Sequence, residues 1–353
     1  MSLLDRVVSA RRELAARILL DVGLVAGGAL ALAAVAVLTA HDGGLAYDTR
    51  AYWLAARHVL DGTALYSQAT VSDLGAYKYP PIFAQVFIPA AWLPELLVAW
   101  LWRISGILCL RYIVGSWKAA VVACAFVPVL IELSLGNVTL QIAAVLFFAL
   151  RDRRGAYLLP WVAALKFGPV LLVPYLWFRM PESRRPLLIG TAVFAAACLA
   201  SYVTTPDQWS GYAATFGWEN GSVMSGAGVI AIVPSWGGLD FVLRFAIAGA
   251  AALYATLTRR AWLAYAAAVI TCPILAFSRF APLVALWRFR AASAAESGPG
   301  PATTPAPAPG AAEAVARPPR RLGSARGWRQ ACLSTASRRS WGCRSSASSC
   351  SPG

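Results

Sequence analysis

The sequence predicts an all-α, polytopic integral membrane protein with about 8–11 transmembrane helices. The 353 residues are 59% hydrophobic and 13% charged, with a mean hydropathy of +0.60, which leaves too little polar surface to coat a soluble globule. Several apolar runs approach the roughly 20 residues that a helix needs to cross a bilayer. Arginine clusters separate these runs, a pattern typical of cytoplasmic loops.

The first apolar run, residues 16–40, sets the orientation of the chain. Arginines at 6, 11, 12 and 17 lie at its start, and no small-residue cleavage pattern follows a short core. We therefore expect a retained anchor rather than a signal peptide. The positive-inside rule places residues 1–15 in the cytoplasm and the polar segment 41–79 outside, as in a multi-pass protein of the plasma membrane.

Seven further apolar runs follow, at residues 81–102, 119–135, 138–150, 157–177, 187–203, 241–256 and 261–277. Basic clusters at 151–154, 179–185 and 259–260 should be cytoplasmic. No Lys or Arg occurs in residues 186–243, so their polar part, 206–238, should face outward together with segment 41–79. Region 103–118 is either an interfacial helix or part of another span.

Residues 157–177 carry basic clusters on both sides and should therefore begin and end in the cytoplasm. A break at Lys166-Phe167-Gly168-Pro169 would supply the turn between two short helices that meet near the outer face, with Pro169 in the first turn of the second. Lipid cannot satisfy the backbone groups that such a break frees, so the break should line a protein-enclosed or wet cavity.

Residues 16–290 form the expected membrane domain. The tail at 291–353 has Pro-Ala repeats and then an Arg-, Ser- and Cys-rich stretch without apolar period, and is predicted to be disordered. Eight arginines lie in this tail, and most of the remaining positive charge flanks the spans, which indicates topology and contact with membrane lipids rather than a nucleic-acid partner. Neither histidines nor cysteines show metal-ligand spacing, so no metal or other cofactor is expected.

Asp48 opens the first external segment and is the candidate general base. A carboxylate can take a proton from an acceptor hydroxyl as that oxygen attacks an electrophilic carbon. Nearby aromatic residues suit sugar faces, although aromatic belts at membrane surfaces have the same composition: Tyr47, Tyr52, Trp53, Tyr66, Tyr77 and Tyr79. The alternative is a helix cap or a solvated acid. Asp42, Asp61 and Asp73 compete for the role, and proximity to the first span favours Asp48.

Charged residues at membrane depth are costly and mark candidate functional positions. Lys166 precedes a predicted helix start, and an ammonium beside a helix N-terminus favours phosphate. Arg279, at a second external turn, and Lys78 are weaker candidates for the same contact. The alternative is that these residues snorkel to the surface or pair with an acid. Asn137 either caps the helix that continues to residue 150 or assists the phosphate.

One carboxylate and one phosphate site suffice for a glycosyl transfer. Hydrolysis of a plain glycoside needs a second carboxylate to protonate the departing alcohol. A sugar that leaves from phosphate needs no such acid, because cations stabilise the departing anion.

Motifs spread along the chain resemble those of the polytopic GT-C glycosyltransferases. They are DTRAYW at 48–53, LDGTALY at 60–66, YPP at 79–81, Gly136-Asn137 with Gln141, the Lys166-x-x-Pro169 break, and Asn220-Gly221-Ser222 before Gly226. Their order over about residues 15–290 is similar to that of glycosyltransferase family 87, the actinobacterial polyprenyl-phosphate-mannose-dependent mannosyltransferases.

This resemblance implies a GT-C-like helical bundle whose two external segments form the active face. A polyprenyl-phosphate donor would give mannose, with inversion, to an extracytoplasmic glycolipid or glycan acceptor. Asp48 would be the base, and Lys166, Arg279 and Lys78 would contact the donor phosphate. The expected substrate-binding residues are Tyr52, Trp53, Tyr79, Asn137, Gln141 and Asn220.

Two alternatives stay open. A transporter or lipid flippase often has repeated halves and helices broken near the midplane. Here no internal repeat is found, and the predicted break lies toward one face. The second alternative is a truncated, inactive homologue, since the C-terminal membrane part is short.

Overall fold

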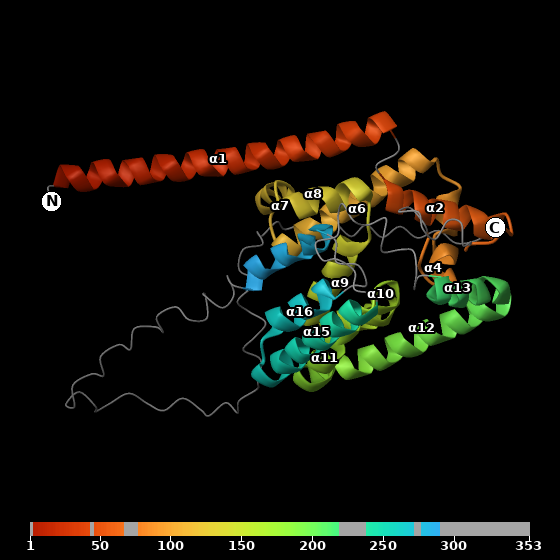
Figure 1. The fold of residues 1–353 in the computed structure, drawn as a ribbon. Helices are drawn as coiled ribbons and strands as arrows, with labels where there is room; N and C mark the ends of the chain where they lie inside the picture. Colours follow the sequence, from red (N-terminus) through yellow and green to blue (C-terminus); the bar gives the residue numbers. More distant parts are fainter. Residues whose placement is uncertain (1–2, 43–45, 67–76, 219–237, 272–276, 290–353) are drawn as a thin grey trace, which may run out of the picture. The chain divides into compact units, whose positions relative to one another are not determined.

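The computed structural model describes residues 3–42, 46–66, 77–218, 238–271 and 277–289 (Figure 1). In these ranges the regular structure is helical and contains no strand, which confirms the predicted all-α class. The predicted tail at 291–353 and residues 219–237 of the second polar segment lie outside the described residues. Besides the helices introduced below, the elements are α2 (Tyr47–Leu60), η1 (Arg153–Leu158), η2 (Gly168–Leu172), α11 (Val173–Arg179), α13 (Pro206–Trp218), α15 (Gly238–Thr258) and η4 (Phe277–Ala285).

Three helices in the described part of the chain are long and apolar enough to cross a membrane. They are Ala10–Val37 within α1 (Leu3–Asp42), α6 (Glu95–Val114), and Pro181–Thr204, which comprises η3 (Pro181–Ser183) and α12 (Arg184–Thr204). A fourth results if α7 (Trp117–Cys124) and α8 (Val127–Leu135), bent by 88°, count as one span. The membrane character is confirmed, and the described residues contain three or four full-length candidate spans where the sequence predicted about 8–11 for the whole chain.

Proline and glycine explain the lower number, because they divide apolar runs into helices too short to span. The run at 81–102 forms α4 (Pro81–Val86) and α5 (Ile88–Ala91), and the span α6 begins only after Pro94. Most of region 103–118, whose role the sequence left open, therefore lies in a candidate span rather than in an interfacial helix.

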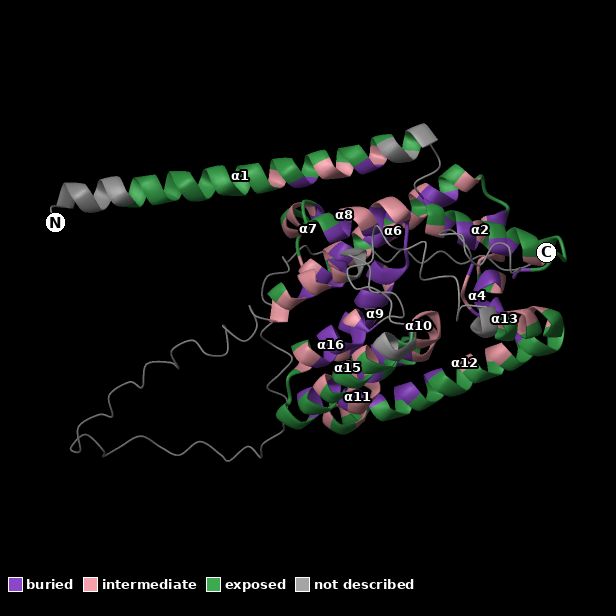
Figure 2. Ribbon diagram, viewed as in Figure 1, coloured by how far each residue is buried: buried purple, intermediate pink, exposed green. Residues whose placement is uncertain are grey.

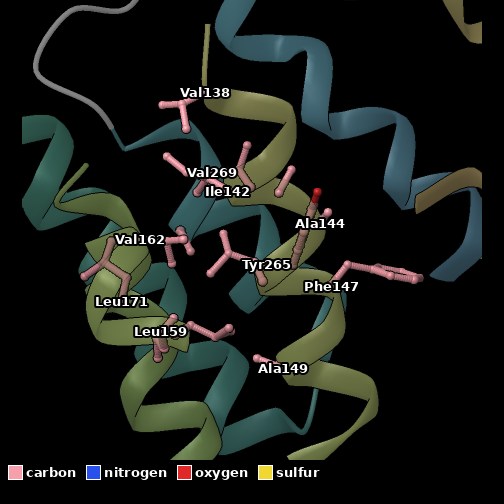
Figure 3. Packing of buried hydrophobic residues seen from close by; sticks show 14 of the residues in the cluster. Val138, Ile142, Ala144, Phe147, Ala149, Leu159, Val162, Leu171, Tyr265 and Val269 are labelled. Carbon is pink, nitrogen blue, oxygen red and sulfur yellow. The ribbon is translucent and has the colours of Figure 1, made fainter. Parts of the chain in front are cut away.

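Helix α9 (Thr139–Arg151) runs through the main apolar core. Its buried Ile142 and Phe147 pack among Leu159 of α10 (Leu159–Leu165) and Tyr265 of α16 (Ala261–Ile270) (Figure 3). In contrast, much of α1 and α12 is exposed (Figure 2), and large apolar side chains lie on these surfaces. Exposed apolar helices of this length suit a lipid environment.

The predicted break at Lys166 is confirmed. Helix α10 ends before Lys166, whose backbone is extended, and η2 then continues into α11 with Pro169 in the first turn of η2. Gly168 lies against the end of α16, where an added Cβ would come within 2.3 Å of the carbonyl oxygen of Thr271. Only a residue without a side chain permits this approach, so the break is packed tightly against α16.

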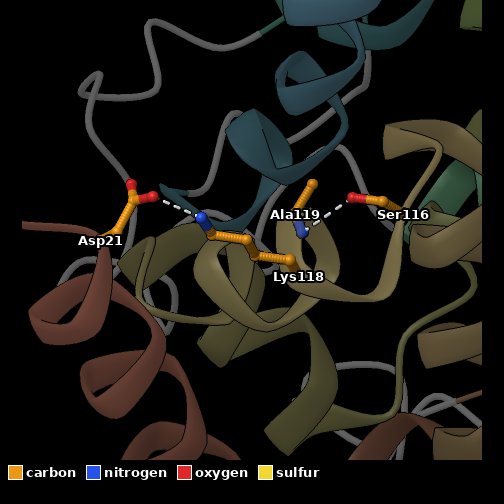
Figure 4. A network of polar contacts seen from close by, with 4 residues as sticks. All are labelled: Asp21, Ser116, Lys118 and Ala119. Atoms are coloured by element: carbon orange, nitrogen blue, oxygen red, sulfur yellow. Dashed lines mark hydrogen bonds and ion pairs between the residues drawn. The ribbon is translucent and has the colours of Figure 1, made fainter. Parts of the chain in front are cut away.

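Small residues bring α1 against α7. A Cβ at Gly28 would lie 1.7 Å from the carbonyl oxygen of Val121, the close approach that glycine allows between membrane helices. Lys118 Nζ and Asp21 Oδ2 pair across the same contact at 2.5 Å (Figure 4). Ser116 Oγ caps the start of α7 by accepting a main-chain N–H bond at 3.1 Å. These contacts hold α7 beside the first span.

The basic clusters predicted to share one side of the membrane meet at one end of the bundle. Arg179, which ends α11, donates to the Thr256 carbonyl near the end of α15, just before the pair at 259–260. Arg151 and Arg288 both lie over the Phe147 ring, 5.0 and 5.4 Å from its centroid. In addition, η1 packs on η3 and α12.

The two segments predicted to be external contact each other at the opposite end of α12. Gln208 on α13 accepts a hydrogen bond from the Leu65 N–H and donates to the Thr63 carbonyl, both at 2.9 Å. The rings of Tyr66 and Tyr212 lie 5.8 Å apart. Since α12 is 21 residues long, this contact is separated from the arginine end of the helix by about 30 Å.

Candidate active site

Four polar side chains converge at the N-terminal end of α9. Asn137 Nδ2 donates to Asp48 Oδ2 at 2.5 Å. Asn137 Oδ1 accepts from Lys166 Nζ at 2.8 Å and from Thr139 Oγ1 at 2.9 Å. Lys166 Nζ also donates to Thr139 Oγ1 at 2.5 Å. The candidate base and the candidate phosphate ligand, far apart in sequence, therefore belong to one hydrogen-bonded network.

Helix α2 positions Asp48 against the end of α8. Asp48 lies in the first turn of α2, where a carboxylate favours the positive end of the helix dipole. The next residue, Thr49, donates from Oγ1 to the Gly136 carbonyl at 3.0 Å. Gly136 ends α8 with φ +66, and a Cβ there would lie 2.1 Å from Thr49 Oγ1. Glycine is thus required at this turn for both conformation and space.

Arg103 also binds the end of α8. Its Nε and Nη2 donate to the carbonyls of Leu133 and Ser134, each at 3.0 Å, and its side chain is buried inside the candidate span α6. These carbonyls belong to the last turn of α8 and have no partner within that helix. Sequence reasoning missed this contact, although an arginine within an apolar run was the available signal.

Lys166 occupies the gap between α10 and η2 and is half-buried. Beside it lies a cavity of about 10 Å³, room for about one water, walled by α9, η2, α16 and η4. Thr139, Lys166 and Thr271 supply polar lining, and Ile142 and Ala268 are among the apolar wall residues. A small cavity with three polar lining residues at the helix break agrees with the prediction that the break lines a cavity.

Aromatic side chains connect the site to the second polar segment. The hydroxyls of Tyr52 and Tyr79 lie 3.3 Å apart, and ring contacts continue from Tyr79 through Tyr77 and Tyr66 to Tyr212. Burial raises the pKa of Tyr66 and of Tyr77 well above the ordinary value for tyrosine. These two hydroxyls keep their protons and are unsuited to act as the base.

Three other predicted site residues, Trp53, Gln141 and Lys78, are also described by the structure. Trp53 Nε1 donates to the Leu93 carbonyl at 3.0 Å. This bond joins Trp53 to the segment just before α6. The Gln141 amide, oriented to satisfy its neighbours, accepts from Ser105 Oγ at 2.9 Å and donates to the Asn137 carbonyl at 3.2 Å. Lys78 is half-buried between Tyr77 and Tyr79 in the chain.

Three further candidates, Arg279, Asn220 and Asp73, lie wholly or partly outside the described residues, and a fourth, Asp61, is far from the network. The backbone of Arg279 belongs to η4, but its side chain lies outside the described residues, as does all of Asn220. Asp61, a competitor for the base, follows the last residue of α2 and is exposed, about 20 Å along the helix from Asp48. Asp73 also lies outside the described residues.

The predicted helix cap by Asn137 is wrong. Helix α9 starts at Thr139 without a side-chain cap, and the Asn137 amide is used by Asp48 and Lys166 instead. The Thr139 hydroxyl was not predicted to take part. A capping signal cannot distinguish an amide bonded to its own helix from one bonded to residues distant in sequence.

Comparison with known proteins assigns the family. A model of glycosyltransferase family 87 matches residues 77–295, a range that contains Asn137, Thr139 and Lys166, while Asp48 and its motif precede it. No curated protein and no solved structure was found to match. The match covers more than half of the 353 residues, and the helices have the apolar character of a membrane enzyme of this kind. The chain therefore belongs to glycosyltransferase family 87.

Proposed function

We propose that this membrane glycosyltransferase transfers mannose from a polyprenyl-phosphate donor to an extracytoplasmic glycolipid or glycan acceptor, with inversion. The observation that carries the proposal is the network in which Asn137 joins Asp48 to Lys166. It puts a carboxylate and an ammonium close to one another at a helix break. A proton acceptor and a cation for phosphate are the two groups that this reaction needs.

The proposed reaction is a single displacement. Asp48 removes the proton from the acceptor hydroxyl while that oxygen forms a bond to C1 of the sugar. The bond between C1 and the phosphate oxygen breaks, and its electron pair leaves with the phosphate. Lys166 stabilises the negative charge on that phosphate, so no acid is required. Attack opposite the leaving group converts a β-linked donor into an α-linked product.

The distribution of charge supports an extracytoplasmic site. Thr139 lies at the start of α9 beside the network, whereas Arg151 ends the same helix among the basic clusters. The 13 residues of α9 separate these two ends by about 20 Å. If the arginine end is cytoplasmic, as the positive-inside rule requires, the network faces the other side of the membrane.

Apolar residues near Lys166 suit the lipid tail of the donor. Phe167 and Val170, which flank the break, are 46% and 45% exposed. A phosphate held at Lys166 would leave its polyprenyl chain beside these side chains and in the hydrocarbon of the membrane. We therefore propose that the donor enters from the lipid, headgroup first toward the cavity beside Lys166.

The test is transfer of radiolabelled mannose from polyprenyl-phosphate mannose by the full chain in proteoliposomes, with cell-envelope lipids as acceptors. Asp48→Asn should lower the rate by about 10²- to 10⁴-fold, and Lys166→Gln by about 10²- to 10³-fold. Asp61→Asn, at the exposed end of the same helix, is the matched control and should retain the rate. Asp48→Asn and Lys166→Gln must insert in the membrane as well as the parent chain does.

Transport is the second candidate, and the break at Lys166 is the observation that favours it, because transporters use broken helices. Movement of the donor across the bilayer that survives Asp48→Asn, without transfer by the parent chain, would support transport and reject the transferase. Absence of both activities would support the inactive homologue.

A further inference from the structure

Both the nitrogen and the oxygen of the Asn137 side-chain amide form hydrogen bonds to other side chains of the protein. Its Nδ2 meets Asp48, and its Oδ1 meets Lys166 and Thr139. The side chain is only 7% exposed. The sequence predicted that Asn137 binds substrate, but an amide engaged at both ends by protein groups is better suited to orient its neighbours.

Charge fixes the direction of this amide. A carboxylate only accepts hydrogen bonds and an ammonium only donates them, so the NH₂ group must face Asp48 and the oxygen must face Lys166. Thr139 adds a second donor to Oδ1 and itself accepts from Lys166. Donation from a cation to Oδ1 polarises the amide and strengthens the hydrogen bond that it gives to the carboxylate.

Direct contact between Asp48 and Lys166 would hinder the proposed chemistry. The base has to meet the acceptor hydroxyl and the ammonium has to meet the phosphate, whereas a closed ion pair would occupy both groups and make the carboxylate less basic. We propose that Asn137 is a positioning residue that holds the base and the phosphate ligand one amide apart and keeps the Asp48 carboxylate oriented. This inference rests on the proposed function of those two residues.

In the described part of the chain, the helices packed against α2 that carry charged residues are α6, with Glu95, Arg103 and Arg111, and α8, with the buried Glu132. Arg50 of α2 pairs with Glu95 of α6 at 3.5 Å. Arg103 of α6 donates to the main chain of α8, which also carries the buried Glu132. Neither α4 nor α5 contains a charged residue. Among the described residues, Lys166 is a cation that hydrogen bonds connect to Asp48 through Asn137.

The decisive variant is Asn137→Asp in the full chain, because it keeps the size of the side chain and replaces the NH₂ donor with a carboxylate oxygen. Repulsion between two carboxylates should move the acidic limb of the pH–rate profile upward by about one pH unit or more. Asn137→Ala should lower kcat on the order of 100-fold, with a much smaller change in the donor KM. Ser134→Ala, which removes an intrahelical hydrogen bond of α8 near the same turn, is the control and should change neither.

Infrared difference titration of the Asp48 carboxylate, with Asp48→Asn as reference, supplies a readout without turnover. In Asn137→Asp, the pH at which half of the Asp48 carboxylate is protonated should rise by the same amount as the acidic limb of the pH–rate profile. An unshifted midpoint, or wild-type kcat and pH profile in Asn137→Asp, would overturn the inference even when Asp48→Asn is inactive. Transfer that persists in Asp48→Asn would instead reject the proposed base, whatever the Asn137 variants do.

Discussion

Gly136→Ala is the substitution whose cost the structure defines best. Gly136 has φ +66, a left-handed conformation that costs an alanine about 1–2 kcal/mol. The new Cβ would lie 2.1 Å from Thr49 Oγ1, so the threonine side chain must move and lose its bond to the Gly136 carbonyl. That bond contributes about 1 kcal/mol. The free energy of unfolding should therefore fall by about 2–3 kcal/mol.

A double-mutant cycle with Thr49→Ala separates the two contributions. Without Oγ1 the steric conflict disappears, so Gly136→Ala should then cost only the conformational strain of about 1–2 kcal/mol. The coupling energy between the two positions should be about 1 kcal/mol, measured by denaturant unfolding in detergent micelles with tryptophan fluorescence. Transfer activity should fall in Gly136→Ala, because the turn that carries Asn137 is displaced. An equal cost in both backgrounds, or a cost below about 0.5 kcal/mol, would refute this account of the turn.

Three other predictions address the surrounding structure. Arg103→Lys should lower the free energy of unfolding by about 1–3 kcal/mol and reduce transfer, because lysine keeps the charge but not the fork that binds two carbonyls of α8; thermal unfolding and the transfer assay check both effects. Gly28→Leu should separate α1 from α7, seen as faster proteolysis of the first span, whereas Gly23→Leu, with no atom within 4 Å of the added Cβ, should not. Burial raises the pKa of Tyr66 above that of an unfolded tyrosine, which is about 10. The stability that this shift contributes is fully present below the unfolded pKa. It is lost as pH rises above that value, because the unfolded state then releases the proton first. Unfolding measured at pH 9 and pH 11 should therefore show a smaller loss of stability in Tyr66→Phe than in the parent chain.

The sequence predicted those features that depend on residues close together in the chain. Apolar length and composition predicted the membrane helices, and the pair Gly168-Pro169 predicted the break at Lys166 because both residues act on their own backbone. Flanking arginines predicted which helix ends lie together. The described residues contain fewer full spans than the sequence predicted, since hydropathy does not register that α5 ends at Ala91 and that α6 begins only after Pro94.

The site itself depended on contacts that no sequence window contains. Asn137 is 89 residues from Asp48 and 29 from Lys166, and each of these residues also has a local interpretation as a cap or a snorkelling side chain. Likewise, Arg103 reaches carbonyls 30 and 31 residues away. The sequence shows which residues have side chains suited to catalysis or phosphate binding. Which of these side chains form hydrogen bonds with one another depends on how the helices pack.

Helix ends explain how a polar network can form among apolar helices. Backbone groups at helix ends lack intrahelical partners, and lipid cannot supply them. Here the end of α8 is satisfied by Arg103 and Thr49, and the gap after α10 places Lys166 beside the first turn of α9. The turn after α8 and the gap after α10 thus bring Asn137 and Lys166 into the same network. In the proposed reaction, a phosphate and a hydroxyl at this point would meet polar groups that the protein already holds in place, so little reorganisation would be required when charge develops.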